Sequence, residues 1–104
     1  MRTPYTQGIW QVKPGYADEF VAGWVEFVGW TTSSVEGSGV RTLFRDLGDD
    51  HRFVSMGAWR DLAAIERWRS MPGWSDGIGK LRELFVRFEP TTLELVADAD
   101  GRCG

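Results

Sequence analysis

Residues 52–59 read RFVSMGAW, and residues 60–74 continue as RDLAAIERWRSMPGW. Successive side chains of a strand point to opposite faces of the sheet. One face of this segment carries Phe53, Ser55, Gly57 and Trp59, and the other carries Val54, Met56 and Ala58. A strand that is apolar on both faces needs a cover on both faces. We therefore expect helices on one face of the sheet and, on the other, the sheet of a second copy of the chain in a twofold homodimer.

The segments before this strand show a strand, a helix and a second strand. Residues 8–13 are rich in β-branched and aromatic residues and stop at Pro14-Gly15, which predicts a short strand closed by a turn. From Tyr16 a helix is predicted, because apolar residues recur at helical spacing. Its stripe consists of Phe20, Trp24, Phe27 and Thr31. Residues 40–46 and 52–59 form a hairpin around the polar turn 47–51.

The segments after it predict two helices and a last strand. A helix begins at 59–61 and is stopped by Pro72-Gly73. A further helix is predicted up to Pro90 from the spacing of Ile78, Leu81, Leu84, Phe85 and Phe88. Residues 91–97 alternate as a strand. The order β-α-β-β-α-(α)-β predicts an α+β, ferredoxin-like fold with an antiparallel sheet.

Length and charge exclude several classes of protein. The 104 residues fit one domain, 1–97, with a polar and flexible tail at 98–104. The net charge of −3 provides no positive field for nucleic acid. No apolar run reaches the roughly 18 residues that span a bilayer, and the N-terminus has no signal-peptide core, so a cytoplasmic protein without membrane contact is predicted. One cysteine, Cys103, and one histidine, His51, make no metal-ligand set, and we expect no metal or cofactor.

Two stretches carry a resemblance to a known family. FVSMGAWRDLAAIERWRSMPGW at 53–74 and GIWQVKPGYADEF at 8–20 resemble the antibiotic biosynthesis monooxygenase family, and the likeness extends over most of residues 5–97. The resemblance implies a dimeric α/β barrel. Some members of that family are cofactor-free oxygenases of polycyclic phenols or quinols, and others degrade haem. The resemblance thus implies a cofactor-independent monooxygenase that acts on a small aromatic molecule.

Residue by residue, the resemblance is partial. Trp59 matches the family tryptophan that lines the pocket beside the substrate. Ser55 stands where those oxygenases have an asparagine, and a family tyrosine falls near Ile65. In the haem-degrading branch Trp68 is matched, but the axial histidine falls at Ile78, so a haem-binding or haem-degrading relative without that ligand is the least favoured of three alternatives and no haem is expected.

Three residues form the candidate catalytic set, and each has a structural alternative. Trp59 either stacks on a planar substrate or plugs the core. Ser55, beside Gly57, either forms a polar pocket floor or is satisfied by the backbone. His51 either acts as the general base that deprotonates a phenol or lies in a solvated hairpin turn beside two aspartates.

The candidate substrate-binding residues also leave alternatives open. Gln11 either donates a hydrogen bond into the pocket or faces solvent. Trp24 and Trp68 pack on the sheet or touch a ligand, and Trp74, after the Pro72-Gly73 break, belongs to a lid or to the core. Arg41 and Arg45 share one strand face, where they either pair with a carboxylate of a ligand or of a partner chain or face water.

The aromatic content supports two functions of different kinds. The chain has six Trp, six Phe and two Tyr residues, which either line a ligand pocket or fill a large core. The first case favours the oxygenase. The second favours a non-catalytic small-molecule-binding or stress-associated dimer.

Overall fold

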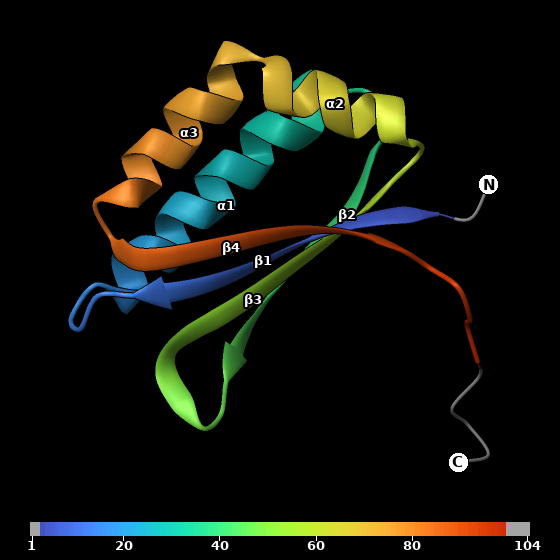
Figure 1. Ribbon diagram of the computed structural model, residues 1–104. Helices are drawn as coiled ribbons and strands as arrows, with labels where there is room; N and C mark the ends of the chain where they lie inside the picture. Colours follow the sequence, from blue (N-terminus) through green and yellow to red (C-terminus); the bar gives the residue numbers. More distant parts are fainter. Residues whose placement is uncertain (1–2, 100–104) are drawn as a thin grey trace.

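The computed structural model describes residues 3–99 and shows one antiparallel sheet with three helices packed on one face (Figure 1). The elements are β1 (Pro4–Val12), α1 (Ala17–Ser34), β2 (Ser38–Asp46), β3 (Asp49–Trp59), α2 (Leu62–Ser70), α3 (Pro72–Arg82) and β4 (Phe85–Glu94). The strand order is β2-β3-β1-β4. The predicted α+β, ferredoxin-like architecture is therefore confirmed.

Strand β1 lies between β3 and β4 and decides which side chains face the helices. Its residues alternate strictly between buried and half-buried, because one face of the sheet packs on the helices and the other does not. Thr6, Gly8, Trp10 and Val12 are on the helix face. The strand starts four residues earlier than the predicted 8–13, because Thr6 and Gly8 pair with β3 and β4 although neither carries a large apolar side chain.

Helix α1 packs on the sheet with the predicted stripe. Phe20, Trp24, Phe27 and Thr31 are its buried residues, and Asp18 and Glu19 lie in its first turn, where the helix dipole favours acidic side chains. The turn before the helix needs Gly15, whose φ of 85° is costly for other residues.

The hairpin between β2 and β3 is tighter than the sequence suggests. Asp46 pairs with Asp49, so only Leu47 and Gly48 form the turn. The Gly48 N–H donates to the Asp46 carboxylate at 2.8 Å, which fixes the turn locally. The prediction that His51 lies in the turn was wrong, because β3 extends to Asp49 and includes it.

The C-terminal third departs most from the prediction. Pro72 does not only stop a helix; it occupies the first turn of α3, where the missing N–H of proline costs nothing. Helix α3 ends at Arg82, and Phe85 and Phe88 belong to strand β4. Their three-residue spacing is typical of a helix face, and in a regular strand it would place them on opposite faces. The pairing of β1 with β4 shifts register between Gln11 and Val12, and both rings contact Trp10 of β1, with centroids 3.9 Å away for Phe88 and 5.4 Å away for Phe85. Pro90 lies within β4, which an edge strand tolerates.

Helix α2 begins at Leu62, not at the predicted 59–61. Asp61 is its N-cap, and its carboxylate accepts a hydrogen bond from the Ala64 N–H at 2.8 Å. Trp59 therefore remains the last residue of β3.

The second face of the sheet carries apolar side chains that no described element covers. Members of this open face include Tyr5, Ile9, Phe44, Val54, Met56 and Leu93, which lie on the sides of their strands opposite the helix-facing residues. Phe44 is 51% exposed.

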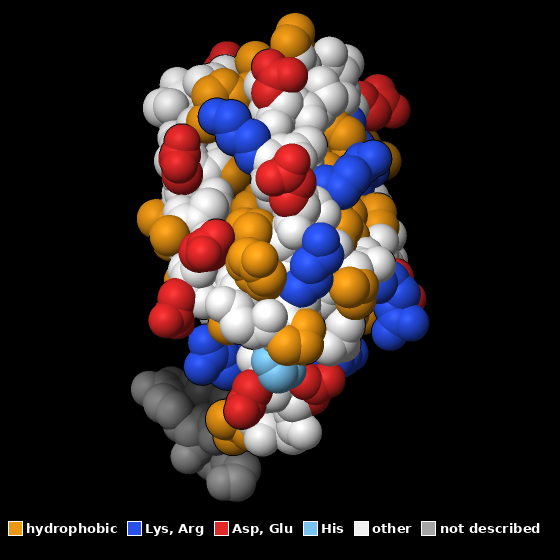
Figure 2. Space-filling view, turned by 90° about the vertical axis from the view of Figure 1, so that its left-hand side faces the viewer, with side chains coloured by type: hydrophobic (Ala, Val, Ile, Leu, Met, Phe, Trp, Pro, Cys, Tyr) orange, Lys and Arg blue, Asp and Glu red, His pale blue; other side chains and the backbone are white. Residues whose placement is uncertain are grey.

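Figure 2, which looks at one end of the molecule, shows acidic and basic side chains interspersed rather than gathered into a patch of one sign.

Two predictions concern the chain ends and membranes. No helix in the described part is long and apolar enough to cross a membrane. Most of the predicted tail, including Cys103, lies outside the described residues, and Asp98 and Ala99 belong to no helix or strand.

Candidate functional site

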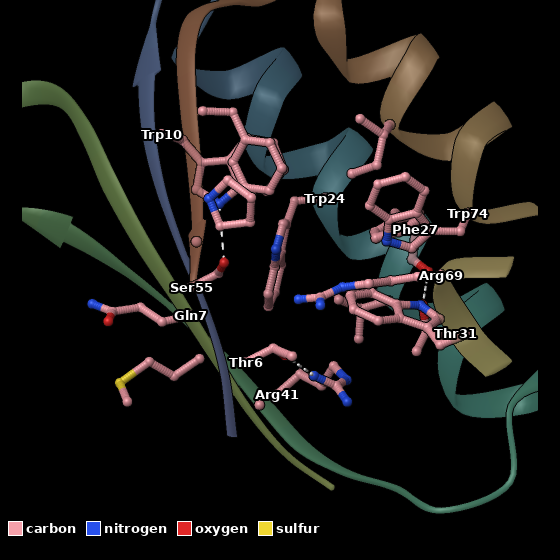
Figure 3. Close-up of a pocket in the computed structure, with 18 residues that line it drawn as sticks. Thr6, Gln7, Trp10, Trp24, Phe27, Thr31, Arg41, Ser55, Arg69 and Trp74 are labelled. Carbon is pink, nitrogen blue, oxygen red and sulfur yellow. Dashed lines mark hydrogen bonds between the residues drawn. The ribbon is translucent and has the colours of Figure 1, made fainter. Parts of the chain in front are cut away.

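An aromatic cavity lies between the helix-facing side of the sheet and the three helices (Figure 3). Its volume is about 50 Å³, and it is partly open to solvent. Its aromatic lining residues are Trp10, Trp24, Phe27, Trp68, Trp74 and Phe88. Concave and mostly apolar sites with a few polar groups are the usual form of small-molecule sites.

The sheet side of the cavity carries small residues and one polar group, the Ser55 hydroxyl. Gly8 of β1 and Gly57 of β3 let neighbouring side chains pack closely on this floor, and Ser55 lies between the two glycines on the same face. The Ser55 Oγ accepts a hydrogen bond of 2.9 Å from the Trp10 Nε1–H. A Cβ added at Gly8 would lie 2.8 Å from the Ser55 Oγ and 2.9 Å from the Trp10 and Phe88 rings, so the glycine makes room for these three side chains.

The helix side is held by one buried hydroxyl. The Thr31 Oγ1 on α1 accepts from the Trp68 Nε1–H on α2 at 3.1 Å and donates to the Phe27 carbonyl at 3.1 Å. Trp74 of α3 meets Trp68 edge-on, with ring centroids 6.2 Å apart. These contacts hold the Trp68 and Trp74 rings in place and join the three helices around one space.

Arg41 is the most unusual side chain of the site. It lies on β2 opposite Gly57, and its guanidinium carbon is 4.1 Å from the Trp59 ring centroid and 5.6 Å from that of Trp68. The Thr6 Oγ1 accepts from Arg41 Nη1 at 3.5 Å and from Trp59 Nε1 at 2.9 Å. Burial lowers the pKa of the Arg41 guanidinium to about 10, so the group is still charged at neutral pH.

The charge of the lining is positive. Arg41 and Arg69 line the cavity, and none of the 18 lining residues is Asp, Glu or His. Arg69 donates from Nη2 to the Thr92 Oγ1 at 3.2 Å, which ties α2 to β4. In the described part of the chain, no group of three or more His, Cys, Asp or Glu side chains is placed to hold a metal ion.

Four of the seven predicted site residues line the cavity. Ser55 lies at the sheet side, and Trp24, Trp68 and Trp74 lie at the helix side. The structure places Trp59 directly behind Arg41 rather than at the cavity surface, with 2% of it exposed. A substrate would therefore meet Arg41 before Trp59.

The other two predicted residues lie elsewhere. Gln11 donates to the Asp49 carboxylate at 3.4 Å, on the open face of β1, instead of donating into the cavity. The His51 side chain is 39% exposed, and its Nδ1 lies 3.9 Å from the Asp49 carboxylate near the hairpin. Neither residue lines the cavity.

Sequence reasoning missed several lining residues. Thr6 precedes the strand predicted at 8–13, and Thr31 stands in a helical stripe as an ordinary packing residue. Trp10 and Phe88 were not singled out, because their stacking depends on the pairing of β1 with β4. The two-residue alternation of Thr6, Gly8 and Trp10 is the one signal that would have found this face.

Comparison with known proteins decides the family. The sequence profile described as antibiotic biosynthesis monooxygenase matches residues 7–80, which is more than half of the chain. The chain belongs to this family. The resemblance inferred from residues 8–20 and 53–74 is thereby confirmed.

Solved structures agree with the fold of this antibiotic biosynthesis monooxygenase family protein. SnoaB, a cofactor-independent oxygenase from Streptomyces nogalater, superposes with a TM-score of 0.83 at 20% identity, covering 98% of this chain and 99% of SnoaB. PA3566 from Pseudomonas aeruginosa gives 0.77 at 21% identity over 93% and 97% of the two chains. A conserved protein from Methanosarcina mazei gives 0.80 at 17% identity over 90% and 93%. No curated protein matches the sequence.

Proposed function

We propose that this protein is a cofactor-independent monooxygenase that acts on a planar polycyclic phenol or quinol bound in the aromatic cavity. The observation that carries the proposal is the cavity itself, in which four of the six tryptophans surround one space. Membership of the family and the structural similarity to SnoaB support it. Flat aromatic walls favour a flat aromatic ligand, because stacked and edge-on ring contacts add to the free energy of burial.

The reaction needs only the substrate and dioxygen. An anthrone-type phenol loses a proton from its reactive CH₂ carbon, and the resulting anion gives one electron to O₂. The substrate radical and superoxide then combine to form a C–O bond, and the proton taken up by the peroxide gives a hydroperoxide. Loss of water converts this carbon to a carbonyl. The substrate CH₂ is oxidised, and one atom of O₂ becomes the new carbonyl oxygen while the other leaves as water.

The lining residues fit the binding and polarisation that this chemistry requires. Arg41 and Arg69 place positive charge at a cavity wall that has no acidic residue, so the anionic form of a phenol is favoured there. No lining residue is a His, Asp or Glu, so the proton of the substrate passes to solvent through its own acidity. The tryptophan walls hold the ring and exclude water from it.

An oxygen electrode tests the proposal with dithranol, a tricyclic phenol with one reactive CH₂ carbon. Protein stripped of metals with EDTA should consume dioxygen and form the corresponding anthraquinone at equal rates, above the rate without protein. Ser55→Leu, which fills the cavity floor, should abolish this excess, and Ser33→Leu on the exposed side of α1 should retain it. Equal rates for both variants and for buffer alone would contradict the proposal.

A second function is favoured by the absence of a general base from the cavity lining. In that case the protein binds a small aromatic molecule without turning it over. Saturable binding of dithranol under anaerobic conditions, together with no protein-dependent dioxygen uptake, is the result that distinguishes this function from the oxygenase.

We also propose that the open face of the sheet packs on the same face of a second copy. Strand β3 carries apolar residues on both faces, with Val54 and Met56 on the open face and Phe53 and Trp59 on the helix face. Face-to-face packing of two twisted sheets about a twofold axis buries such a surface. Light scattering after gel filtration measures the mass, and a monomeric mass at micromolar concentration would contradict this arrangement.

A further inference from the structure

Two side chains that line the cavity carry hydrogen-bond donors with no acceptor in the protein. Three buried side-chain nitrogens in residues 3–99 lack a hydrogen-bond partner, namely Arg41 Nε, Arg41 Nη2 and Trp74 Nε1. Both residues line the aromatic cavity. An unpaired buried donor costs free energy, so an acceptor from a ligand or from water is expected beside these groups.

The two free nitrogens of Arg41 form one edge of the guanidinium. Nε–H and one Nη–H of an arginine point in parallel, and their spacing matches the two oxygens of a carboxylate. The third nitrogen, Nη1, is the one directed to the Thr6 hydroxyl. The guanidinium carbon lies 4.1 Å from the ring centroid of Trp59 and 5.6 Å from that of Trp68. These two rings hold the guanidinium in place.

Among residues 3–99, no carboxylate pairs with this edge. No ion pair within 4.0 Å joins Arg41 or Arg69 to an acidic side chain in the described part of the chain, whereas Arg52 and Arg60 are both paired. The chain as a whole is acidic, with a net charge of −3, so acidic residues are abundant elsewhere and missing here. The site has the polarity of an anion receptor inside an aromatic wall.

We propose that the ligand is an aromatic carboxylate whose carboxyl group pairs side-on with Nε and Nη2 of Arg41, while its ring lies among the cavity tryptophans. This inference rests on the proposed function for the identity of the cavity as the substrate site, and it adds the substrate class. A second oxygen on the ring accepts from Trp74 Nε1. A phenolate offers a single oxygen, which accepts from both Arg41 donors only in a bent, bifurcated arrangement, whereas the two oxygens of a carboxylate match the two parallel N–H groups one to one.

Calorimetric titration with a matched pair of ligands tests the proposal. The probes are 3-hydroxy-2-naphthoate and 3-hydroxy-2-naphthamide, which differ only in the negative carboxyl group. At pH 8 the wild-type protein should bind the acid more tightly than the amide by about tenfold or more, the size expected for a charge-assisted hydrogen-bonded pair. Arg41→Gln should bring the two affinities together.

Two further variants separate the guanidinium fork from charge in general. Arg41→Lys retains the charge but not the parallel donors, and it should lose most of the preference. Arg45→Gln removes an exposed charge from the same face of β2, outside the aromatic cavity, and should leave the preference unchanged. Thermal melts identify any variant that does not fold, and Arg41→Lys then stands in for Arg41→Gln.

The results separate this inference from the proposed function. Equal affinity for acid and amide, or a preference that survives in Arg41→Gln, would overturn the carboxylate assignment even if dithranol is oxidised. A preference for the acid that depends on Arg41 supports it even if no dioxygen is consumed with any ring compound.

Discussion

Replacement of Arg41 by methionine should stabilise the protein, because the guanidinium is buried against Trp59 with two donors unpaired. Methionine retains the apolar stem that packs on the ring and removes the charge. Removing an uncompensated buried charge is one of the few single substitutions expected to raise the free energy of unfolding.

The magnitude follows from the pKa. Its fall to about 10 corresponds to roughly 3 kcal/mol of unfavourable burial of the charged form, which is present at every pH below about 10. Solvent reaches part of the side chain, so this is an upper limit. The lost cation–π contact with Trp59 offsets about 1 kcal/mol. The two contributions leave an upper limit of about 2 kcal/mol. Because solvent screens part of the charge, we expect a net gain in the free energy of unfolding of about 1 kcal/mol and a rise in Tm of roughly 4–8 °C.

Urea unfolding at pH 7, followed by tryptophan fluorescence, measures this change. Arg45→Met is the matched control, since Arg45 is exposed on the same face of β2, and its effect should stay within about 0.5 kcal/mol. A loss of 1 kcal/mol or more in Arg41→Met would refute the reasoning, because it would mean that the guanidinium is favourably paired in the ligand-free protein.

Four other substitutions test separate parts of the account. Gly57→Ala places a methyl group on the Arg41 guanidinium and should remove the preference for naphthoate over naphthamide in calorimetry; an unchanged preference would show that Arg41 is not seated there. Ser55→Ala removes the acceptor of Trp10 Nε1 and should cost about 1 kcal/mol in urea unfolding, and no loss would argue against this hydrogen bond. His51→Gln should leave the rate and pH profile of dithranol oxidation unchanged, since His51 lies outside the cavity, and a lower rate that has lost its acidic limb would restore His51 as the general base. Phe44→Glu puts a charge on the open face and should halve the mass measured by light scattering, whereas a dimeric variant would place the interface elsewhere.

The sequence predicts the fold well where the spacing of apolar residues fits only one type of secondary structure. The stripe of α1 and the two apolar faces of β3 each fit a single secondary structure, and both are confirmed. The spacing of Phe85 and Phe88 favours a helix, because residues three apart in a regular strand point to opposite faces. Their assignment to β4 depends on pairing with β1, a long-range contact that local pattern does not contain.

The site is predicted less completely for a related reason. Trp24, Trp68 and Trp74 are found from sequence because large aromatic side chains on helices either fill a core or line a cavity. Trp59 takes the buried, core-plug alternative, since the cross-strand pairing of Arg41 with Gly57 lays the guanidinium over the Trp59 ring. Only the register of β2 on β3 reveals this arrangement.

The indole N–H signals of the six tryptophans test the central claim most directly, because they report where an aromatic ligand binds. In a ¹⁵N-labelled sample titrated with 3-hydroxy-2-naphthoate, the signals of Trp24, Trp68 and Trp74 should shift saturably with a common Kd. The signal of Trp30, which lies outside the aromatic cavity beside α3, should stay nearly constant. Saturable shifts that are largest at Trp30, or no saturable shift at any indole, would contradict the assignment of this cavity as the substrate site.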